Sequence, residues 1–222
     1  MNKKVMLNLG CGATRPQNWI NTDSSLNAQV QKIPVLGDWL AKAFIKSASY
    51  SSDNVVYMNL NTKWGFASES VDVVYASHLF EHLSHRAATL FLSESYRTLK
   101  PGAVVRIVVP DLYKTAKKYV SEYEEGDSDA SKSFLWAINM GLENMYPYKS
   151  NSFLKKTIAR WQEYPHQHKY MYDELSLRVL LAAHGFQDVK SLTYGVSDSI
   201  EEIKDVEGDR EHYISIYMEA RK

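Results

Sequence analysis

Four histidines occupy positions at which a side chain could move a proton. Histidine changes its charge near neutral pH, so it is the usual choice for that task. His78 directly follows an apolar segment, His82 comes one helical turn later, and the polar segment 164–168 contains the other two, His166 and His168. Beside a hydroxyl group that must lose its proton during a reaction, such a side chain would act as a general base. It would raise the rate of that reaction about 10²–10⁴-fold. For each histidine, a structural or surface role is the competing interpretation.

The same histidines have little of the spacing that is typical of a metal site. In zinc-protease helices a Glu directly follows the first His, whereas here Leu79 follows His78 and Glu81 precedes His82. The pair His166 and His168 leaves open a second possible metal site, but the sequence predicts no bound metal. The only cysteine is Cys11, which excludes an intrachain disulfide and a thiolate cluster and indicates a reducing compartment.

A glycine-rich turn follows the first predicted strand. Gly10 and Gly12 flank Cys11, and glycine allows both a tight backbone turn and the close approach of a ligand. The next predicted strand ends at Asp23, whose carboxylate can accept hydrogen bonds from two ribose hydroxyls. A dinucleotide fingerprint requires glycine where this chain has Arg15, and no phosphate loop occurs. The pattern favours a nucleoside without phosphates. The alternatives are an ordinary turn at the glycines and an Asp23 that only caps the turn after its own strand.

The elements that must position these residues alternate between strands and helices. Such alternation predicts a parallel sheet with helices on both faces, which binds ligands beyond the carboxyl ends of its strands. A buried helical stripe is expected at Ala88, Phe91, Leu92, Ser95 and Leu99, and segment 100–102 is expected to form a turn. Predicted strands cover 5–9, 19–22, 55–58, 71–76, 104–109, 189–194 and 213–219, and predicted helices cover 84–99, 112–124, 132–145 and 173–183.

Composition limits the possible classes of protein. With 222 residues, of which 45% are hydrophobic and 23% charged, the chain is expected to form one domain, 1–222, with insertions at about 24–54 and 126–172. The 26 basic and 26 acidic residues balance, which argues against broad binding of nucleic acid or anionic membranes. No apolar run approaches the length of a membrane span or a secretory core, so a cytoplasmic protein is expected. The oligomeric state stays open.

Four segments together resemble the class I methyltransferases that use S-adenosylmethionine (SAM). They occur in the family's order over about residues 5–111, and they are Leu7-Asn8-Leu9-Gly10-Cys11-Gly12, Ile20-Asn21-Thr22-Asp23, the stretch 66–83 that ends in Ser77-His78-Leu79-Phe80-Glu81-His82-Leu83, and Leu99-Lys100-Pro101-Gly102-Ala103. The resemblance implies a Rossmann-like three-layer α/β sandwich. Its sheet would be seven-stranded and mostly parallel, with helices on both faces and an antiparallel C-terminal strand.

The resemblance also implies SAM as the cofactor and suggests which residues hold it. Gly10, Cys11 and Gly12 would face its methionine and ribose parts, and Asp23 would bind the ribose hydroxyls. The remaining expected contacts are Asn59 with the adenine amino group, Leu60 with the adenine ring, and Ser77 beside the cofactor. The chain departs from the family at Asn8 and Asn59, two positions where the family commonly has an acidic residue.

Two further features suggest the methyl acceptor. Segments 168–173 and 210–213 resemble a bacterial branch that is often associated with surface-polysaccharide gene clusters. The 15 tyrosines and 5 tryptophans would suit stacking on sugar rings. We therefore expect methyl transfer to a sugar hydroxyl of a surface polysaccharide or its precursor. The alternatives are N- or O-methylation of another small metabolite, and a non-catalytic SAM-binding module.

Overall fold

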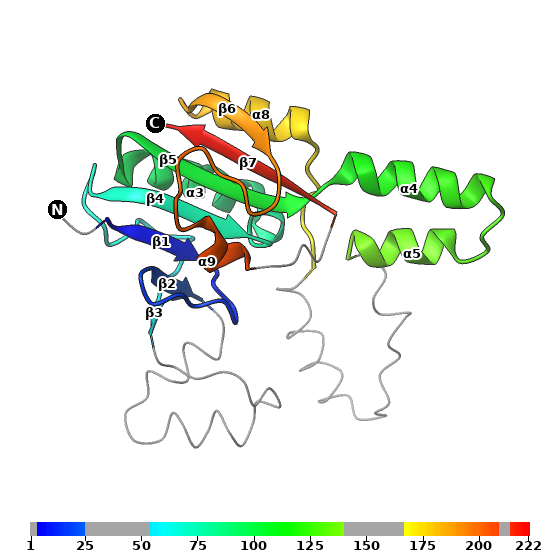
Figure 1. The fold of residues 1–222 in the computed structure, drawn as a ribbon, viewed down its shortest axis with the longest axis horizontal. Coiled ribbons are helices and arrows are strands. Elements are labelled where there is room, and N and C mark those ends of the chain that lie inside the picture. Colours follow the sequence, from blue (N-terminus) through cyan, green and yellow to red (C-terminus); the bar gives the residue numbers. More distant parts are fainter. Residues whose placement is uncertain (1–3, 25–53, 140–166, 209–213) are drawn as a thin grey trace, which may run out of the picture.

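The computed structural model describes residues 4–24, 54–139, 167–208 and 214–222, and a seven-stranded sheet forms its centre (Figure 1). The strands are β1 (Met6–Leu9), β2 (Ile20–Asp23), β3 (Val55–Tyr57), β4 (Val71–Ser77), β5 (Leu99–Pro110), β6 (Gln187–Leu192) and β7 (Ser215–Arg221). Their order is β3-β2-β1-β4-β5-β7-β6, and β7 runs in the opposite direction to the other six of these strands. The predicted mostly parallel α/β sheet with an antiparallel C-terminal strand is confirmed.

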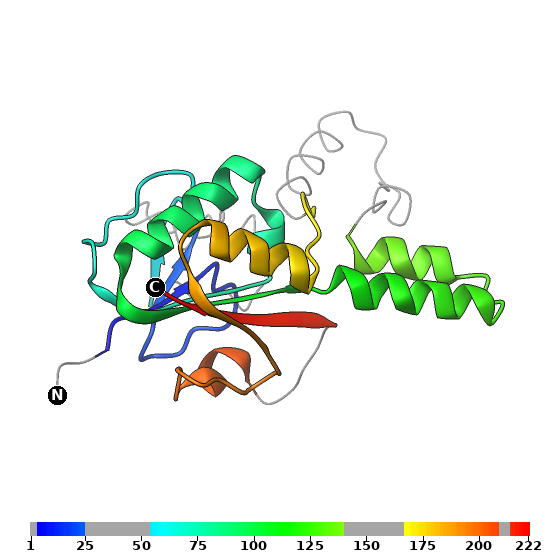
Figure 2. The ribbon, with the colours of Figure 1, turned by 90° about the horizontal axis from the view of Figure 1, so that it is seen from above.

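Helices cover both faces of the sheet, which gives three layers (Figure 2). The described helices are η1 (Phe80–His82), α3 (His85–Thr98), α4 (Leu112–Glu124), α5 (Ala130–Ala137), α8 (Glu174–Ala183) and α9 (Ile203–Glu207). On one face α3 and α8 bury Phe91, Leu92, Leu177 and Leu181. All five residues of the predicted stripe on 84–99 are buried. The capping box at Asp173 confirms the predicted start of α8.

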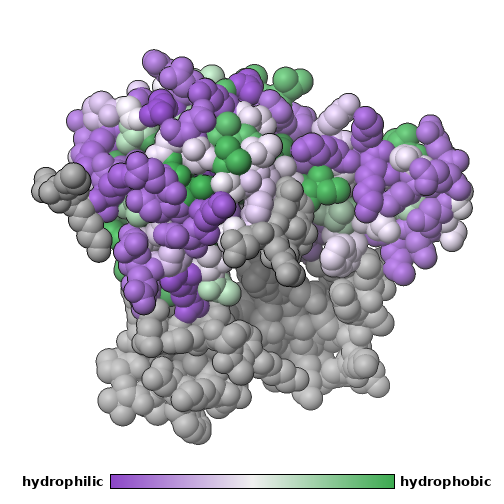
Figure 3. All heavy atoms as spheres, in the orientation of Figure 1, coloured by the Kyte–Doolittle hydropathy of each residue, from purple (hydrophilic) through white to green (hydrophobic). Residues whose placement is uncertain are grey.

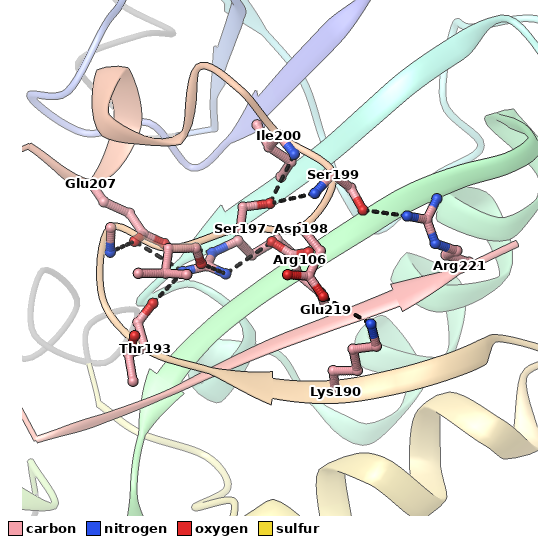
Figure 4. A network of polar contacts seen from close by, with 12 residues as sticks. Arg106, Lys190, Thr193, Ser197, Asp198, Ser199, Ile200, Glu207, Glu219 and Arg221 are labelled. Atoms are coloured by element: carbon pink, nitrogen blue, oxygen red, sulfur yellow. Dashed lines mark hydrogen bonds and ion pairs between the residues drawn. The ribbon is translucent and has the colours of Figure 1, made fainter.

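The opposite face contains a helix that the sequence did not predict, α9. Its Ile203 and Val206 pack against this side of the sheet. The fully buried Arg106 of β5 lies beside it, with Nε 2.6 Å from Glu207 Oε1 and Nη1 2.9 Å from Glu219 Oε1. The same guanidinium donates to the carbonyl oxygens of Thr193 and Val196, so one side chain ties α9 and the loop before it to the sheet (Figure 4).

The predicted turn at residues 100–102 is wrong, because this segment belongs to β5. The amide of Gly102 donates to the carbonyl of Lys222 at 2.9 Å, and the amide of Lys222 donates to the carbonyl of Ala103 at 3.0 Å. Gly102 has a φ of 76°, and the pairing with β4 is irregular between Val71 and Val73. The segment thus bends locally but keeps its strand partners.

The predicted bounds of other elements differ by a few residues. The last two strands are β6 and β7 in place of the predicted 189–194 and 213–219. The predicted helix 132–145 corresponds to α5 as far as residue 137, and its part beyond 139 lies outside the described residues. The insertion at 24–54 lies almost wholly outside them, so the single-domain division stays a prediction. The helices α4 and α5 extend away from the sheet as a pair (Figure 1).

The order in which strands are added across the sheet reverses between β1 and β4, and the carboxyl ends of these two strands lie at that switch point. Leu9 pairs with Ala76, and from there β1 leads to β2 on one side while β4 leads to β5 on the other. Ligands of open α/β sheets bind in the crevice at such a point. Gly10 follows β1 here, and His78 follows β4.

Charged and polar side chains dominate the described surface in the view of Figure 3. None of the described helices is long and apolar enough to cross a membrane.

Candidate functional site

A backbone hydrogen bond holds the glycine turn, and one side of the turn has open space beside it. Gly10 and Gly12 have φ values of 65° and 51°, and the amide of Cys11 donates to the carbonyl of Thr22 at 2.9 Å. A Cβ on Gly10 would lie 2.9 Å from Leu79 Cδ1, and the positive φ at this position is one that other residues rarely adopt, so the position favours glycine. A Cβ on Gly12 would meet no atom within 4 Å. The first glycine therefore brings the turn against the segment after β4, and the second leaves space for a ligand.

The side chain of Asn8 holds the glycine turn in place, since the described segment between β1 and β2 contains no helix. Its side chain is buried, and Nδ2 donates to the carbonyl of Thr14 at 2.9 Å and to Asn21 Oδ1 at 3.0 Å. Asn21 in turn donates to the carbonyl of Pro16. A carboxylate at position 8 could only accept hydrogen bonds. The departure from the family at this position thus provides the donors that fix the loop.

Asp23 ends β2 beside the turn and is half-buried. Its backbone carbonyl accepts from the amide of Met58, which brings the segment after β3 alongside. Burial raises the pKa of the Cys11 thiol to about 11, with a further contribution from the Asp23 charge and an opposing one from Arg15. This electrostatic influence indicates that the Asp23 carboxylate lies near the turn.

The structure places the other predicted cofactor contacts in different surroundings. Asn59 is exposed, and its Oδ1 accepts from the amide of Asn61 at 2.9 Å. Leu60 is buried in the core. Ser77 is the half-buried last residue of β4. The roles of these three residues toward adenosine, like those of the whole cofactor set, stay predictions.

His78 lies at the carboxyl end of β4 in a backbone conformation that is rare outside glycine, with a φ of 48°. Its amide donates to the carbonyl of Val108 at 2.9 Å, which anchors the bend. On the imidazole, Nδ1 lies 3.3 Å from Glu81 Oε1, and Nε2 lies 3.3 Å from Ser215 Oγ. The ring is thus held at the predicted crevice.

Two of the other predicted histidines join His78 around one carboxylate. The Nε2 atoms of His82 and His168 both lie 3.9 Å from Glu81 Oε1, and the two ring centroids are 4.9 Å apart. Burial lowers the pKa of His168 below its usual range, while the Glu81 charge opposes this effect. His166 lies outside the described residues.

Glu81 is the central residue that the sequence-based prediction missed. It is completely buried in η1, and its backbone carbonyl accepts from the amides of Lys169 and Tyr170 at 2.8 and 3.2 Å. The sequence does contain a signal, because Glu81 stands three residues after His78 and directly before His82. The contribution of His168 comes from a distant segment, which local spacing does not reveal.

Two pockets lined by described residues lie at the opposite edge of the sheet. One, of about 360 Å³, is formed around Lys4, Trp19 and Val56, and the other, of about 280 Å³, around Asp72 and Lys100. Both lie at the amino ends of the strands. We therefore locate the candidate site at the carboxyl edge, where the turn and the histidines converge.

Comparison with known proteins gives a family match over part of the chain. Residues 7–107 match the model of a family described as "Methyltransferase domain". No curated protein sequence matches the chain. Among solved structures, a SAM-dependent methyltransferase from Archaeoglobus fulgidus aligns over 100% of this chain and 87% of its own, with 16% identity and a TM-score of 0.49. A SAM-dependent methyltransferase from Thermotoga maritima, described as a possible histamine N-methyltransferase, aligns over 100% and 84%, with 14% identity and a TM-score of 0.46.

The family match assigns a SAM-dependent methyltransferase activity to the chain, with SAM as the methyl donor. The turn fits this cofactor. The open space at Gly12 admits a ligand close to the backbone, and Asp23 lies beside it as a half-buried acceptor.

Proposed function

We propose that this protein transfers the methyl group of SAM to a hydroxyl of a sugar in a bacterial surface polysaccharide or its precursor. The main support is the histidine cluster at the carboxyl edge of the sheet. His78 lies two residues beyond Ala76, which pairs with the last residue before the glycine turn, and Leu79 packs against Gly10. A proton acceptor next to the donor site suits an acceptor that must lose a proton, as a hydroxyl does.

Each group of the chain has a distinct part in this proposal. SAM supplies an activated methyl group, so the transfer itself requires little chemistry from the protein. Gly10, Gly12 and Asp23 bind and orient the donor. His78 takes the hydroxyl proton on a ring nitrogen, and Glu81 holds that ring through the contact of 3.3 Å with Nδ1. Correct alignment of the acceptor provides the remaining part of the rate enhancement.

Aromatic side chains beside the cluster support a sugar acceptor. Tyr170 is 56% exposed, and it follows His168 by two residues. It lies 4.7 Å from the ring of Tyr172, centroid to centroid. An exposed aromatic face beside polar groups suits the apolar face of a pyranose. A cytoplasmic location, which the single reduced cysteine favours, is part of the proposal.

The test separates donor binding from methyl transfer. Labelled SAM is incubated with a panel of cell-envelope sugar nucleotides, and transfer and SAM affinity are measured for the wild type and two variants. His78→Ala should reduce kcat by about 10²–10⁴-fold with SAM affinity unchanged. Asp23→Ala should weaken SAM binding by about 1–3 kcal/mol, because a hydrogen-bonded acceptor is lost. Asp23→Asn, which keeps one acceptor, should lose less.

Other outcomes assign the chain to one of the alternatives. SAM binding without transfer to any acceptor would indicate a non-catalytic SAM-binding module. Transfer to an amine that survives His78→Ala would indicate N-methylation, which depends less on a base. An equal loss of turnover and of SAM affinity in His78→Ala would place that residue in binding.

A further inference from the structure

The carboxylate of Glu81 is buried among nitrogen atoms, yet it accepts no hydrogen bond from the described residues. The side chain is 0% exposed, and neither oxygen accepts a hydrogen bond from the part of the chain that the structure describes. Burying an ionised carboxylate without a partner is costly, so native structures provide a compensating group. Three imidazole nitrogens surround Oε1 at 3.3, 3.9 and 3.9 Å. Hydrogen bonds are shorter or better aligned than these contacts.

The orientation of His82 makes this arrangement more specific. Its Nδ1 lies 3.1 Å from the backbone carbonyl of Gln167. A carbonyl only accepts, so Nδ1 carries the proton, and Nε2 of the neutral ring turns its lone pair toward Glu81. Two hydrogen-bond acceptors, His82 Nε2 and Glu81 Oε1, then face one another across 3.9 Å. Such a pair requires a cation between its members, either a proton or a metal ion.

The ring of His78 has the same arrangement of one inward and one engaged nitrogen. His78 directs Nδ1 toward Glu81, while its Nε2 contacts Ser215 Oγ at 3.3 Å. His168 directs Nε2 toward Glu81 at a distance of 3.9 Å from Oε1. Metal-binding histidines usually have their second nitrogen fixed in this way by a protein group.

We propose that Glu81, His82 and His168 form a binding site for a divalent transition-metal ion of the zinc class, with His78 at its border. One ligand atom from each of the three residues lies within 4.8 Å of the others. Bonds of about 2.0–2.2 Å to zinc place tetrahedral ligands roughly 3.3 Å apart, so a small contraction closes the site. Two imidazoles and one carboxylate favour zinc over magnesium, which prefers oxygen ligands. This inference replaces the sequence-based prediction of no metal.

The segment that contributes His168 is fixed to the rest of the site. The amides of Lys169 and Tyr170 donate to the carbonyl of Glu81, and the carbonyl of Tyr172 accepts from the amide of Leu112 at 2.9 Å. The ligand geometry is therefore set by backbone contacts that do not depend on the ion. Three protein ligands leave one position of a tetrahedral zinc ion open. If the proposed function holds, this position would bind the acceptor oxygen and lower the pKa of its hydroxyl.

Direct metal binding tests the site without any methyl acceptor. The full chain, prepared without a histidine tag and stripped with a chelator, is titrated with Zn²⁺ against a chromophoric competitor, and with Co²⁺ by visible absorption. One ion per chain should bind. His82→Ala and His168→Ala should each weaken Zn²⁺ binding by about a hundredfold or more, because each removes a direct ligand. The exposed His85→Ala is the matched control and should bind like the wild type.

Glu81→Gln separates a metal site from a merely structural cluster. This variant keeps the shape of the side chain and removes its charge, so it should weaken Zn²⁺ binding. It should also unfold at an equal or higher temperature than the metal-free wild type, because an uncompensated buried carboxylate is gone. The proposal is overturned if the stripped wild type binds no stoichiometric Zn²⁺, or if the three variants bind it as tightly as the wild type. Because these measurements need no SAM, they can succeed or fail independently of the proposed function.

Discussion

At the scale of single residues, Cys11 offers a probe of the donor site because it is the only cysteine in the chain. Its thiol is 7% exposed, and burial raises its pKa to about 11. At pH 8 only about a thousandth of such a thiol is thiolate, the form that reacts. We predict that a disulfide reagent modifies Cys11 some hundredfold more slowly than an ordinary thiol, and that saturating SAM slows it further. Absorbance of the released chromophore measures both rates.

The pH dependence of this reaction follows from the same shift. The modification rate should rise about tenfold per pH unit up to the thiol pKa, and urea-unfolded protein serves as the control with an ordinary thiol. Because the pKa is raised in the folded state, its contribution to stability is complete below the ordinary thiol pKa and is lost as the pH rises toward 11. A rate that levels off near pH 8.5 would contradict the buried position of Cys11.

At the scale of elements, the ion pairs of Arg106 attach α9 and its preceding loop to the sheet. Arg106 is fully buried, and Glu207 and Glu219, its two partners, are nearly so. Arg106→Met keeps the volume but leaves two buried carboxylates without their cation. We predict a loss of about 3–5 kcal/mol in the free energy of unfolding, measured by urea denaturation.

Two matched variants show whether buried charge causes this loss. Adding Glu207→Gln and Glu219→Gln to Arg106→Met should restore much of the stability, because no buried charge is then left without a partner. Lys190→Ala removes the exposed contact with Asp198 and should change the stability little. If Arg106→Met were as stable as Lys190→Ala, the network would have no structural role.

Local sequence patterns predicted the elements whose signals lie within a few residues. They failed for the segments whose structure depends on contacts with residues far along the chain. The alternating strands, the stripe from Ala88 to Leu99 and the cap at Asp173 follow from spacing alone. Segment 100–102 resembles a turn by composition, but its pairing with Lys222 keeps it in β5. Arg106 was predicted as one residue of an apolar strand, because its partners come from far along the chain. Glu81 has two local neighbours, His78 and His82, but its contact with His168 comes from far along the chain and is not revealed by local spacing.

At the scale of the whole molecule, the carboxyl and amino edges of the sheet differ in the residues and contacts that they contain. The carboxyl edge holds the glycine turn, Asp23 and the histidines around Glu81. The amino edge holds the two described pockets, and there Asp72 accepts from the amide of Val5 and from Lys100 Nζ at 2.8 Å. Burial acts against ionisation of Asp72, but Lys100 and the amide of Val5 outweigh it and lower its pKa. The carboxylate of Asp72 at this edge is therefore satisfied, whereas the buried carboxylate of Glu81 at the opposite edge accepts no hydrogen bond from the described residues.

This asymmetry predicts where SAM changes the exchange of backbone amides. A ligand that binds only the folded state suppresses local opening around its own contacts. Saturating SAM should therefore slow hydrogen exchange in segments 10–14, 58–62 and 77–83, as measured by mass spectrometry of peptides. Segments 17–20 and 100–103, which border the amino-edge pockets, are the internal control and should exchange as before. Asp23→Ala should require more SAM for the same protection. Slower exchange that appeared instead at the amino edge would move the donor site to the pocket around Trp19, and the assignment of the glycine turn would be wrong.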